Sequence, residues 1–255
     1  MIPLRDRNPS GTFPAVTVAL IVINVLVFFR EVGQNPRQLQ AFVETHGLRP
    51  ALVTEFLRGG GAEHEGRRVA VVQDERGHRT AVPFDARWVL LPLFTSMFLH
   101  GGWLHLIGNL WYLWIFGDNV EDRLGHLNYA LFYLLCGLGA AVVHVAFNAG
   151  SAVPTVGASG AIAGVLGAYL VAFPRAQVAT LVPILIIFTV VWLPAVVVLG
   201  FWFVIQLVSG MESVRMVQTG GVAWWAHIGG FVFGMLFLFV FQKAPERRRI
   251  YAYYR

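Results

Sequence analysis

Two polar side chains that could react together lie where the chain is otherwise apolar. Ser159 opens a helix-length apolar stretch after Gly157 and Ala158, and His227 opens the last apolar stretch. A serine hydroxyl is a poor nucleophile until a base accepts its proton, and neutral imidazole suits that task near pH 7. The sequence therefore predicts Ser159 as a nucleophile and His227 as its general base. The chemistry would be hydrolysis of an amide inside a membrane.

A third and a fourth candidate lie in another apolar stretch. His105 and Asn109 are four residues apart, so they share one face of a helix, and such side chains in a membrane span normally point inward. Both can donate a hydrogen bond to the same oxygen, and we expect them to serve an oxyanion. If Ser159 starts its helix, the unpaired backbone N–H groups there would help. The alternative is that His105 and Asn109 only hydrogen-bond between helices.

The glycines around these residues have a plainer interpretation. Gly160 with Gly164, and Gly230 with Gly234, form Gly-x-x-x-Gly pairs, which are common where membrane helices pack closely. His227 lies three residues before Gly230 and seven before Gly234, hence on the same face. Close packing of that face would bring the imidazole to the serine hydroxyl, so both interpretations can hold together.

Two rival chemistries fit the sequence poorly. A metal site is disfavoured because the sequence contains no His-Glu-x-x-His and places no carboxylate at ligand spacing from these histidines. An aspartyl protease is excluded because no Asp or Glu falls in the interior of a predicted span, and Asp118, Glu121 and Asp122 lie at the end of the second one. We therefore expect no cofactor, and we expect the single cysteine, Cys136, to serve packing.

The elements that must position these side chains are membrane helices. The chain is 56% hydrophobic and only 13% charged, with a mean hydropathy of +0.63, far from a soluble domain. The formal net charge of +5 comes largely from termini and loops, so nucleic acid is not an expected partner and the lipid bilayer is.

Six windows are long and apolar enough, or nearly so, to cross a bilayer. We expect spans near residues 13–30, 101–120, 127–147, 158–173, 190–209 and 224–242. The first is interpreted as a retained anchor, because no small-residue cleavage site follows it. The fourth is short and rich in Gly and Ala, so we expect other helices to enclose it.

The basic residues predict the orientation of the chain. With six spans both termini lie on one side, and the positive-inside rule places that side in the cytoplasm of a multi-pass cell-membrane protein. The residues that support this are Arg5, Arg7, Arg123, Arg175, Lys243 and Arg247–Arg249. The segment 31–100 would then be outside.

That outer segment is expected to carry structure of its own. Leu39, Phe42 and Val43 have the spacing of an amphipathic helix on the membrane surface, and a second apolar piece covers Leu52–Leu57. Within an insertion at about 59–86, Arg68–Val72 and Thr80–Val82 flank a polar turn at 74–78, which predicts a small β-hairpin. A disordered polar insertion is the alternative.

Taken together, these motifs resemble one known family, the rhomboid intramembrane serine proteases. The resemblance runs in order through His100–Gly125, Gly157–Gly167, Phe173–Arg175 and Ala226–Gly234. It implies an all-α membrane protein, a six-transmembrane-helix bundle with a long extramembrane first loop, forming a single domain over residues 1–255.

The resemblance also implies residue roles. Ser159 and His227 would form a catalytic dyad in a water-filled cavity, and His105, Asn109 and the Ser159 N–H would form the oxyanion hole. Glu121 and Arg123 would brace the cytoplasmic side through hydrogen bonds. The substrates would be transmembrane segments of other proteins, entering between the second and fifth spans. Trp202, Phe203 and the segment 211–222 would then be gating candidates, with lipid-facing packing as the alternative.

The chain departs from the family pattern in three places. Ala163 stands where some members carry an aromatic residue against the catalytic histidine, so another aromatic must orient that ring. Arg87-Trp88 reverses the familiar order of these two residues, and the insertion 59–86 is long and hydrophilic.

Two other function classes remain open. A rhomboid-like protein that binds membrane clients without cutting them would generally lack the serine or the histidine, and this chain keeps both. A small transporter or channel would show paired charges or broken helices at mid-membrane depth, which the sequence does not.

Overall fold

The computed structural model describes residues 1–64, 67–73, 79–184, 187–215 and 222–242. Three segments used in the sequence interpretation fall wholly or partly outside them. These are the polar turn at 74–78, residues 216–221 of the proposed gating segment, and the basic tail from Lys243 onward.

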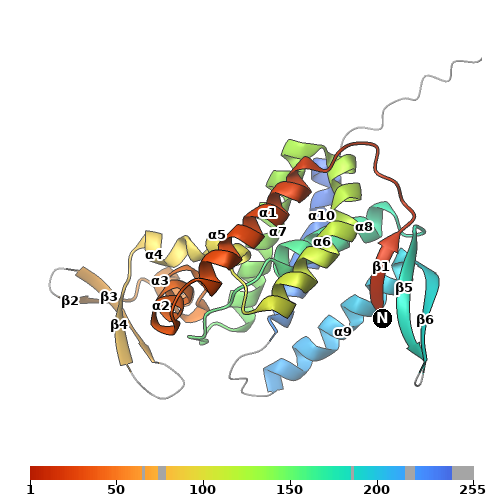
Figure 1. Ribbon diagram of the computed structural model, residues 1–255. Coiled ribbons are helices and arrows are strands. Elements are labelled where there is room, and N and C mark those ends of the chain that lie inside the picture. The colour runs from red at the N-terminus through yellow and green to blue at the C-terminus, as the bar shows by residue number, and fades with distance from the viewer. Residues whose placement is uncertain (65–66, 74–78, 185–186, 216–221, 243–255) are drawn as a thin grey trace, which may run out of the picture.

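Six helices of 14 to 22 residues form the bundle in the described part of the chain (Figure 1). They are α1 (Ala15–Val32), α6 (Trp103–Leu124), α7 (His126–Phe147), α8 (Ser159–Ala172), α9 (Ala195–Arg215) and α10 (Trp224–Phe241). Four of them are long and apolar enough to cross a membrane, and the number is five if α6 and the helical segment before it, bent by 75°, are counted as one span. The expected helical membrane bundle is therefore confirmed.

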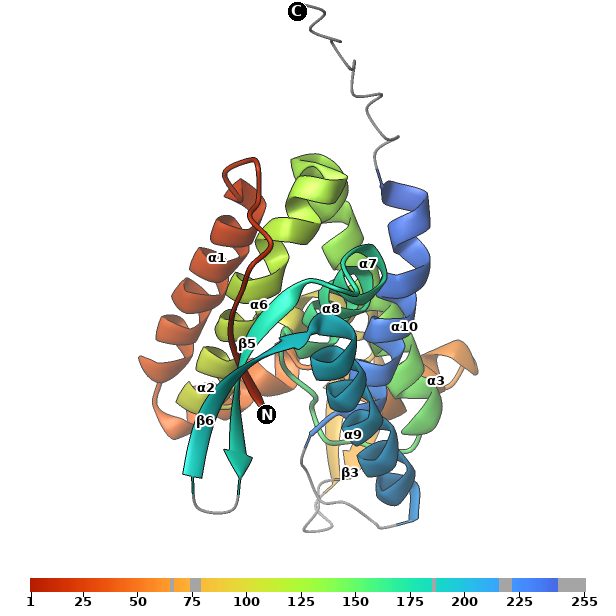
Figure 2. The same cartoon turned by 90° about the vertical axis from the view of Figure 1, so that its right-hand side faces the viewer.

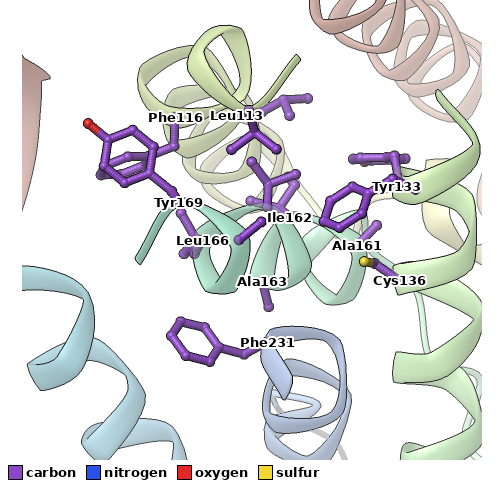
Figure 3. Close-up of a cluster of buried hydrophobic side chains, with 14 of the residues drawn as sticks. Leu113, Phe116, Tyr133, Cys136, Ala161, Ile162, Ala163, Leu166, Tyr169 and Phe231 are labelled. Atoms are coloured by element: carbon purple, nitrogen blue, oxygen red, sulfur yellow. The ribbon is translucent and has the colours of Figure 1, made fainter. Parts of the chain in front are cut away.

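The short helix α8 lies at the centre of the bundle. All its residues from Gly160 to Tyr169 are buried, and α6, α7 and α10 surround it (Figures 1 and 2). Around α8 the core gathers Phe116 of α6, Tyr133 of α7 and Phe231 of α10 (Figure 3). A 14-residue helix is too short to span a bilayer alone, and enclosure by other helices is the condition under which it is tolerated.

Glycines set the distance between α8 and α10. A Cβ placed on Gly234 would lie 1.9 Å from the carbonyl oxygen of Gly164, and one placed on Gly164 would lie 3.2 Å from the carbonyl oxygen of Gly230. Only a residue without a side chain permits such contact between two backbones. The predicted shared face of the Gly-x-x-x-Gly pairs is thus confirmed.

The outer segment folds as short helices and a small sheet. Its elements are α2 (Pro36–His46), α3 (Pro50–Leu57), β2 (Ala62–His64), β3 (Arg67–Gln73), β4 (Arg79–Pro83), α4 (Ala86–Leu90), α5 (Pro92–Thr95) and the 3₁₀ helix η1 (Ser96–Phe98). The amphipathic helix and the β3–β4 hairpin were predicted, and both are observed. Strand β2 adds a third strand to the hairpin, in the order β2-β3-β4.

A second sheet corrects the boundaries of the fifth span. Strands β1 (Ile2–Asp6), β5 (Gln177–Ile184) and β6 (Ile187–Pro194) pair antiparallel in the order β1-β5-β6. The sheet lies against one side of the bundle, next to α6 and α9 (Figure 2). The span predicted at 190–209 therefore begins as a strand, and its helix starts only at Ala195. Apolar β-branched runs do not distinguish strand from helix by periodicity, so pairing with β5 decided the outcome.

Candidate active site

Ser159 is the first residue of α8, at the end of a loop held from two sides. Leu48 and Thr155 exchange backbone hydrogen bonds of 2.9 and 2.7 Å, and the Gly157 N–H donates to the Ser96 carbonyl at 2.9 Å. The φ of Gly157 is +136°, and a Cβ there would lie 2.8 Å from the His105 ring. Glycine is therefore required at this position by both its backbone and its neighbour.

His227 lies in the first turn of α10 and faces Ser159. Its Nε2 is 2.7 Å from the Ser159 Oγ, and the ring is buried. The two residues are 68 positions apart in the sequence, and the glycine contacts between α8 and α10 bring them together. The proximity that the sequence predicted is observed. Such a pair can transfer a proton from the hydroxyl to the imidazole.

Three residues that the sequence analysis did not connect with the histidine surround its ring. Trp202 of α9 and Trp224 of α10 lie with ring centroids 5.8 and 6.2 Å from that of His227. The Nδ1 atom of His227 lies 2.7 Å from the Gln206 Oε1, also on α9. The aromatic residue missing at Ala163 is thus replaced from other helices, while Ala163 itself points toward Phe231 (Figure 3). No sequence motif around Gln206 indicated its contact with His227.

His105 and Asn109 reach the same cavity from α6. The Gly101 N–H donates to the Nδ1 of His105 at 3.3 Å, which leaves the ring proton of a neutral His105 on Nε2, the edge that faces Gly157. The Asn109 Nδ2 is buried, and among the described residues it has no hydrogen-bond partner. Both side chains therefore have a donor free for an oxygen in the cavity.

The cavity that joins these groups has a volume of about 660 Å³. Ser159, His227, His105, Asn109 and Trp202 all line it, together with Tyr112. Its walls come from α6, α8, α9, α10 and the loop before α8. Phe203 is not among the lining residues and stacks on Phe231 at 4.4 Å, which favours the packing role for Phe203.

Two further histidines, His100 and His144, lie near the cavity. His100 is buried, its ring lies 5.2 Å from that of His105, and its backbone N–H donates to the buried Glu31 carboxylate at 3.2 Å. The Nε2 of His144 lies 2.9 Å from the Thr155 Oγ1. Within the described residues, no three His, Cys, Asp or Glu side chains gather where they could hold a metal ion.

Glu121 stabilises the end of the bundle that lies away from Ser159 and His227. Its carboxylate accepts hydrogen bonds from the N–H groups of Val16 and Thr17, both at 2.8 Å, and lies 2.5 Å from the His126 Nδ1. Val16 and Thr17 are in the first turn of α1, whose own cap residue, Pro14, supplies no side-chain bond. Arg123 reaches the Gln242 side chain at 3.3 Å. These contacts agree with the bracing role expected for both residues.

The chain is similar to known proteins over the part that contains the cavity. Residues 87–244 match the family model of the Rhomboid domain. The chain is 30% identical over 168 residues to RHOMBOID-like protein 6, mitochondrial, of Arabidopsis thaliana, covering 66% of this chain and 48% of that protein. It is also 30% identical over 243 residues to RHOMBOID-like protein 2 of the same plant, covering 93% and 68%.

A fungal relative gives a similar match. Identity to Rhomboid protein 1, mitochondrial, of Saccharomyces cerevisiae is 30% over 169 residues, covering 62% of this chain and 44% of that protein. The chain thus spans about half the length of the first relatives it matches. All the cavity residues named above from His105 to His227 lie within the part that matches the family model.

Proposed function

Because the chain belongs to the rhomboid family, we propose that it is an intramembrane serine endopeptidase with Ser159 as nucleophile and His227 as general base. The observation that carries the proposal is the 2.7 Å contact between the His227 Nε2 and the Ser159 Oγ, in a cavity lined by helices of the bundle and the loop before α8. A serine with no base at this distance would remain a weak nucleophile.

The reaction follows from this geometry. The Ser159 Oγ attacks the carbonyl carbon of the scissile amide while His227 accepts its proton, and His227 then gives that proton to the departing amine. Water from the cavity hydrolyses the resulting ester, with His227 as base once more. The Ser159 Oγ loses its proton to the His227 Nε2 and regains one from it when the ester breaks, both along the contact already present between the two side chains.

The negative oxygen of the tetrahedral intermediate needs donors in place before the reaction starts. We assign this role to the Asn109 Nδ2, the His105 Nε2 and the backbone N–H of Ser159. Ser159 opens α8, so its N–H is among those that a helix leaves unpaired, and the positive end of the helix dipole adds to the same field. No cofactor takes part in this scheme.

The proposed substrates are transmembrane segments of other membrane proteins. A helical amide is protected by its own hydrogen bonds, so a segment must unwind before its carbonyl can reach Ser159. Trp202 lines the cavity from α9, and we place substrate access on the side between α6 and α9.

We also propose a multi-pass location in the cell membrane with both termini in the cytoplasm. Arg37 and Arg175 are both exposed and lie on opposite sides in this scheme. In intact cells, a membrane-impermeant maleimide should label Arg37→Cys at once and Arg175→Cys only after permeabilisation. The reverse order would overturn the orientation.

The competing function is capture of membrane clients without cleavage. It shares the fold and the bilayer but needs no proton transfer between Ser159 and His227. A client binder would retain its partner in Ser159→Ala and wild type alike and would release no fragments from either.

The deciding experiment is cleavage of a set of transmembrane substrates in liposomes by wild type, Ser159→Ala and His227→Ala. Ser10→Ala and His46→Ala remove the same groups outside the cavity and serve as matched controls. We expect cleavage by wild type and both controls and none by the two site variants. A wild type that cuts nothing, or an active Ser159→Ala, would overturn the proposal.

A further inference from the structure

Gln206 joins a third helix to the pair formed by Ser159 and His227. Its Oε1 lies 2.7 Å from the His227 Nδ1, on the side of the ring opposite to the serine contact. The Gln206 side chain is among the buried polar groups, with 5% of the residue exposed. Burying an uncharged polar group costs free energy unless that group forms hydrogen bonds.

A second hydrogen bond sets which way the Gln206 amide points. Its Nε2 donates to the Trp202 carbonyl, one turn earlier in α9, at 3.2 Å. With the amide nitrogen used there, the oxygen is the atom that faces His227. An amide oxygen can only accept, so the His227 Nδ1 must carry the ring proton.

This assignment fixes the other ring nitrogen too. In a neutral imidazole one nitrogen donates and the other accepts, so a proton on Nδ1 leaves the Nε2 lone pair free. Nε2 is the atom 2.7 Å from the Ser159 Oγ. Only this tautomer can take the serine proton.

We propose that Gln206 is a positioning residue that holds His227 in the Nδ1–H tautomer and in the orientation that faces Ser159. The inference rests on the proposed function, since it assigns a partner to the same general base. Gln206 touches no reacting atom and acts through the imidazole alone.

The membrane setting explains why an amide suits this task. A carboxylate in the same place would have to be buried as a charge, which is costly within a bilayer. A glutamine offers an oxygen acceptor without that charge. Trp202, one turn before Gln206 in α9, packs its ring 5.8 Å from that of His227, so one helix supplies both the acceptor and part of the packing.

The first test separates acceptor loss from a general loss of structure. Gln206→Met keeps the length of the side chain but removes the acceptor, while Gln206→Glu keeps an oxygen acceptor. Gln177→Met makes the same change where the side-chain amide, within the described part of the chain, bonds only to the Arg175 carbonyl, at 3.4 Å. For each, kcat and KM are measured per active site, with sites counted by a serine-directed fluorophosphonate probe.

We expect Gln206→Met to lower kcat per active site about tenfold, the effect of one lost hydrogen bond, with KM nearly unchanged. Gln206→Glu should recover most of the kcat, and Gln177→Met should match wild type. Equal losses in Gln206→Met and Gln206→Glu, or fewer active sites with an unchanged kcat per site, would overturn the positioning role.

The second test needs neither a variant at Gln206 nor turnover. Nitrogen-15 NMR of histidine-labelled protein distinguishes the two neutral tautomers, and His227→Ala identifies the resonance that belongs to His227. We expect the Nδ1–H tautomer in wild type and in Ser159→Ala. An Nε2–H tautomer would overturn the inference even if cleavage is observed, whereas an inert wild type with the Nδ1–H tautomer would overturn only the proposed function.

Discussion

Gly230 packs directly on the backbone of Gly160, so that a Cβ at position 230 would lie 1.9 Å from the Gly160 carbonyl oxygen. Gly160 follows Ser159 in the chain, and Gly230 lies three residues after His227. This backbone contact between α8 and α10 is therefore one turn or less from the contact between serine and histidine. A side chain at Gly230 would widen the gap that the 2.7 Å hydrogen bond has to bridge.

Gly230→Ala should consequently damage both stability and activity. The clash is with backbone atoms, which cannot rotate away, so we expect a loss of about 3 kcal/mol in the free energy of unfolding. Cleavage per folded molecule should also fall. Both are measurable by SDS titration in mixed micelles and by a fluorescent substrate.

Gly200→Ala is the matched control, because a Cβ there would meet nothing within 4 Å. We expect it to leave cleavage unchanged and to shift stability by at most about 1 kcal/mol, the ordinary gain of alanine over glycine in a helix. Equal effects of the two substitutions would contradict the assigned role of the contact.

Asn109→Ala should slow the chemical step without weakening substrate binding. The buried Asn109 Nδ2 has no partner among the described residues, as expected for a donor kept for a charge that forms only during the reaction. Loss of one such donor costs on the order of 10²- to 10³-fold in kcat. Asn35→Ala, which removes an amide from the cap of α2 outside the cavity, should leave kcat unchanged. A rise in KM alone would point to a binding role instead.

Glu121→Gln should destabilise the protein without changing its catalysis. The amide has one oxygen for the three contacts that the carboxylate now makes, so the first turn of α1 would lose part of its cap. Hydrogen bonds to charged groups contribute about 1.5–3 kcal/mol each, and we expect a loss in that range. The readouts are unfolding in detergent and kcat per probe-labelled site. A lower kcat at full stability would show that Glu121 acts on the site rather than on the bundle.

The stability of the protein should depend on pH through Asp6. Burial raises the pKa of the Asp6 carboxyl above its ordinary value, Asp118 raises it further, and the 2.5 Å hydrogen bond from the Tyr169 hydroxyl opposes them. A raised carboxyl pKa in the folded state means that the protonated form is favoured there. The free energy of unfolding therefore falls as the pH rises from the ordinary pKa through the raised one.

Asp6→Asn keeps an oxygen for Tyr169 and removes this titration. The stability of the variant relative to wild type should increase with pH across that window and level off above it. Unfolding curves of both proteins between about pH 4 and pH 8 would show it. A difference that is constant across this range would contradict the prediction.

The sequence by itself determined the parts of the molecule that depend on local pattern. The apolar windows located the helices of the bundle, because burial in lipid requires a certain length of hydrophobic chain whatever the fold. Four polar residues were identifiable for a related reason. Burying a polar side chain in an apolar window costs free energy, so such residues are rare there. They are Ser159, His227, His105 and Asn109. The helix-face spacing of the glycines also indicated which sides of α8 and α10 meet.

Only the tertiary structure decided what depends on neighbours distant in the chain. Residues 187–194 form a strand because they pair with β5. The apolar pattern of these residues alone does not indicate that pairing. Gln206 lies 21 positions before His227 on another helix, so no spacing linked the two. Trp202 reached the ring because α9 packs against α10, and together with Trp224 of α10 itself it stands in for an aromatic at Ala163. Local periodicity fixes which face a residue occupies, whereas the packing of helices decides what that face meets.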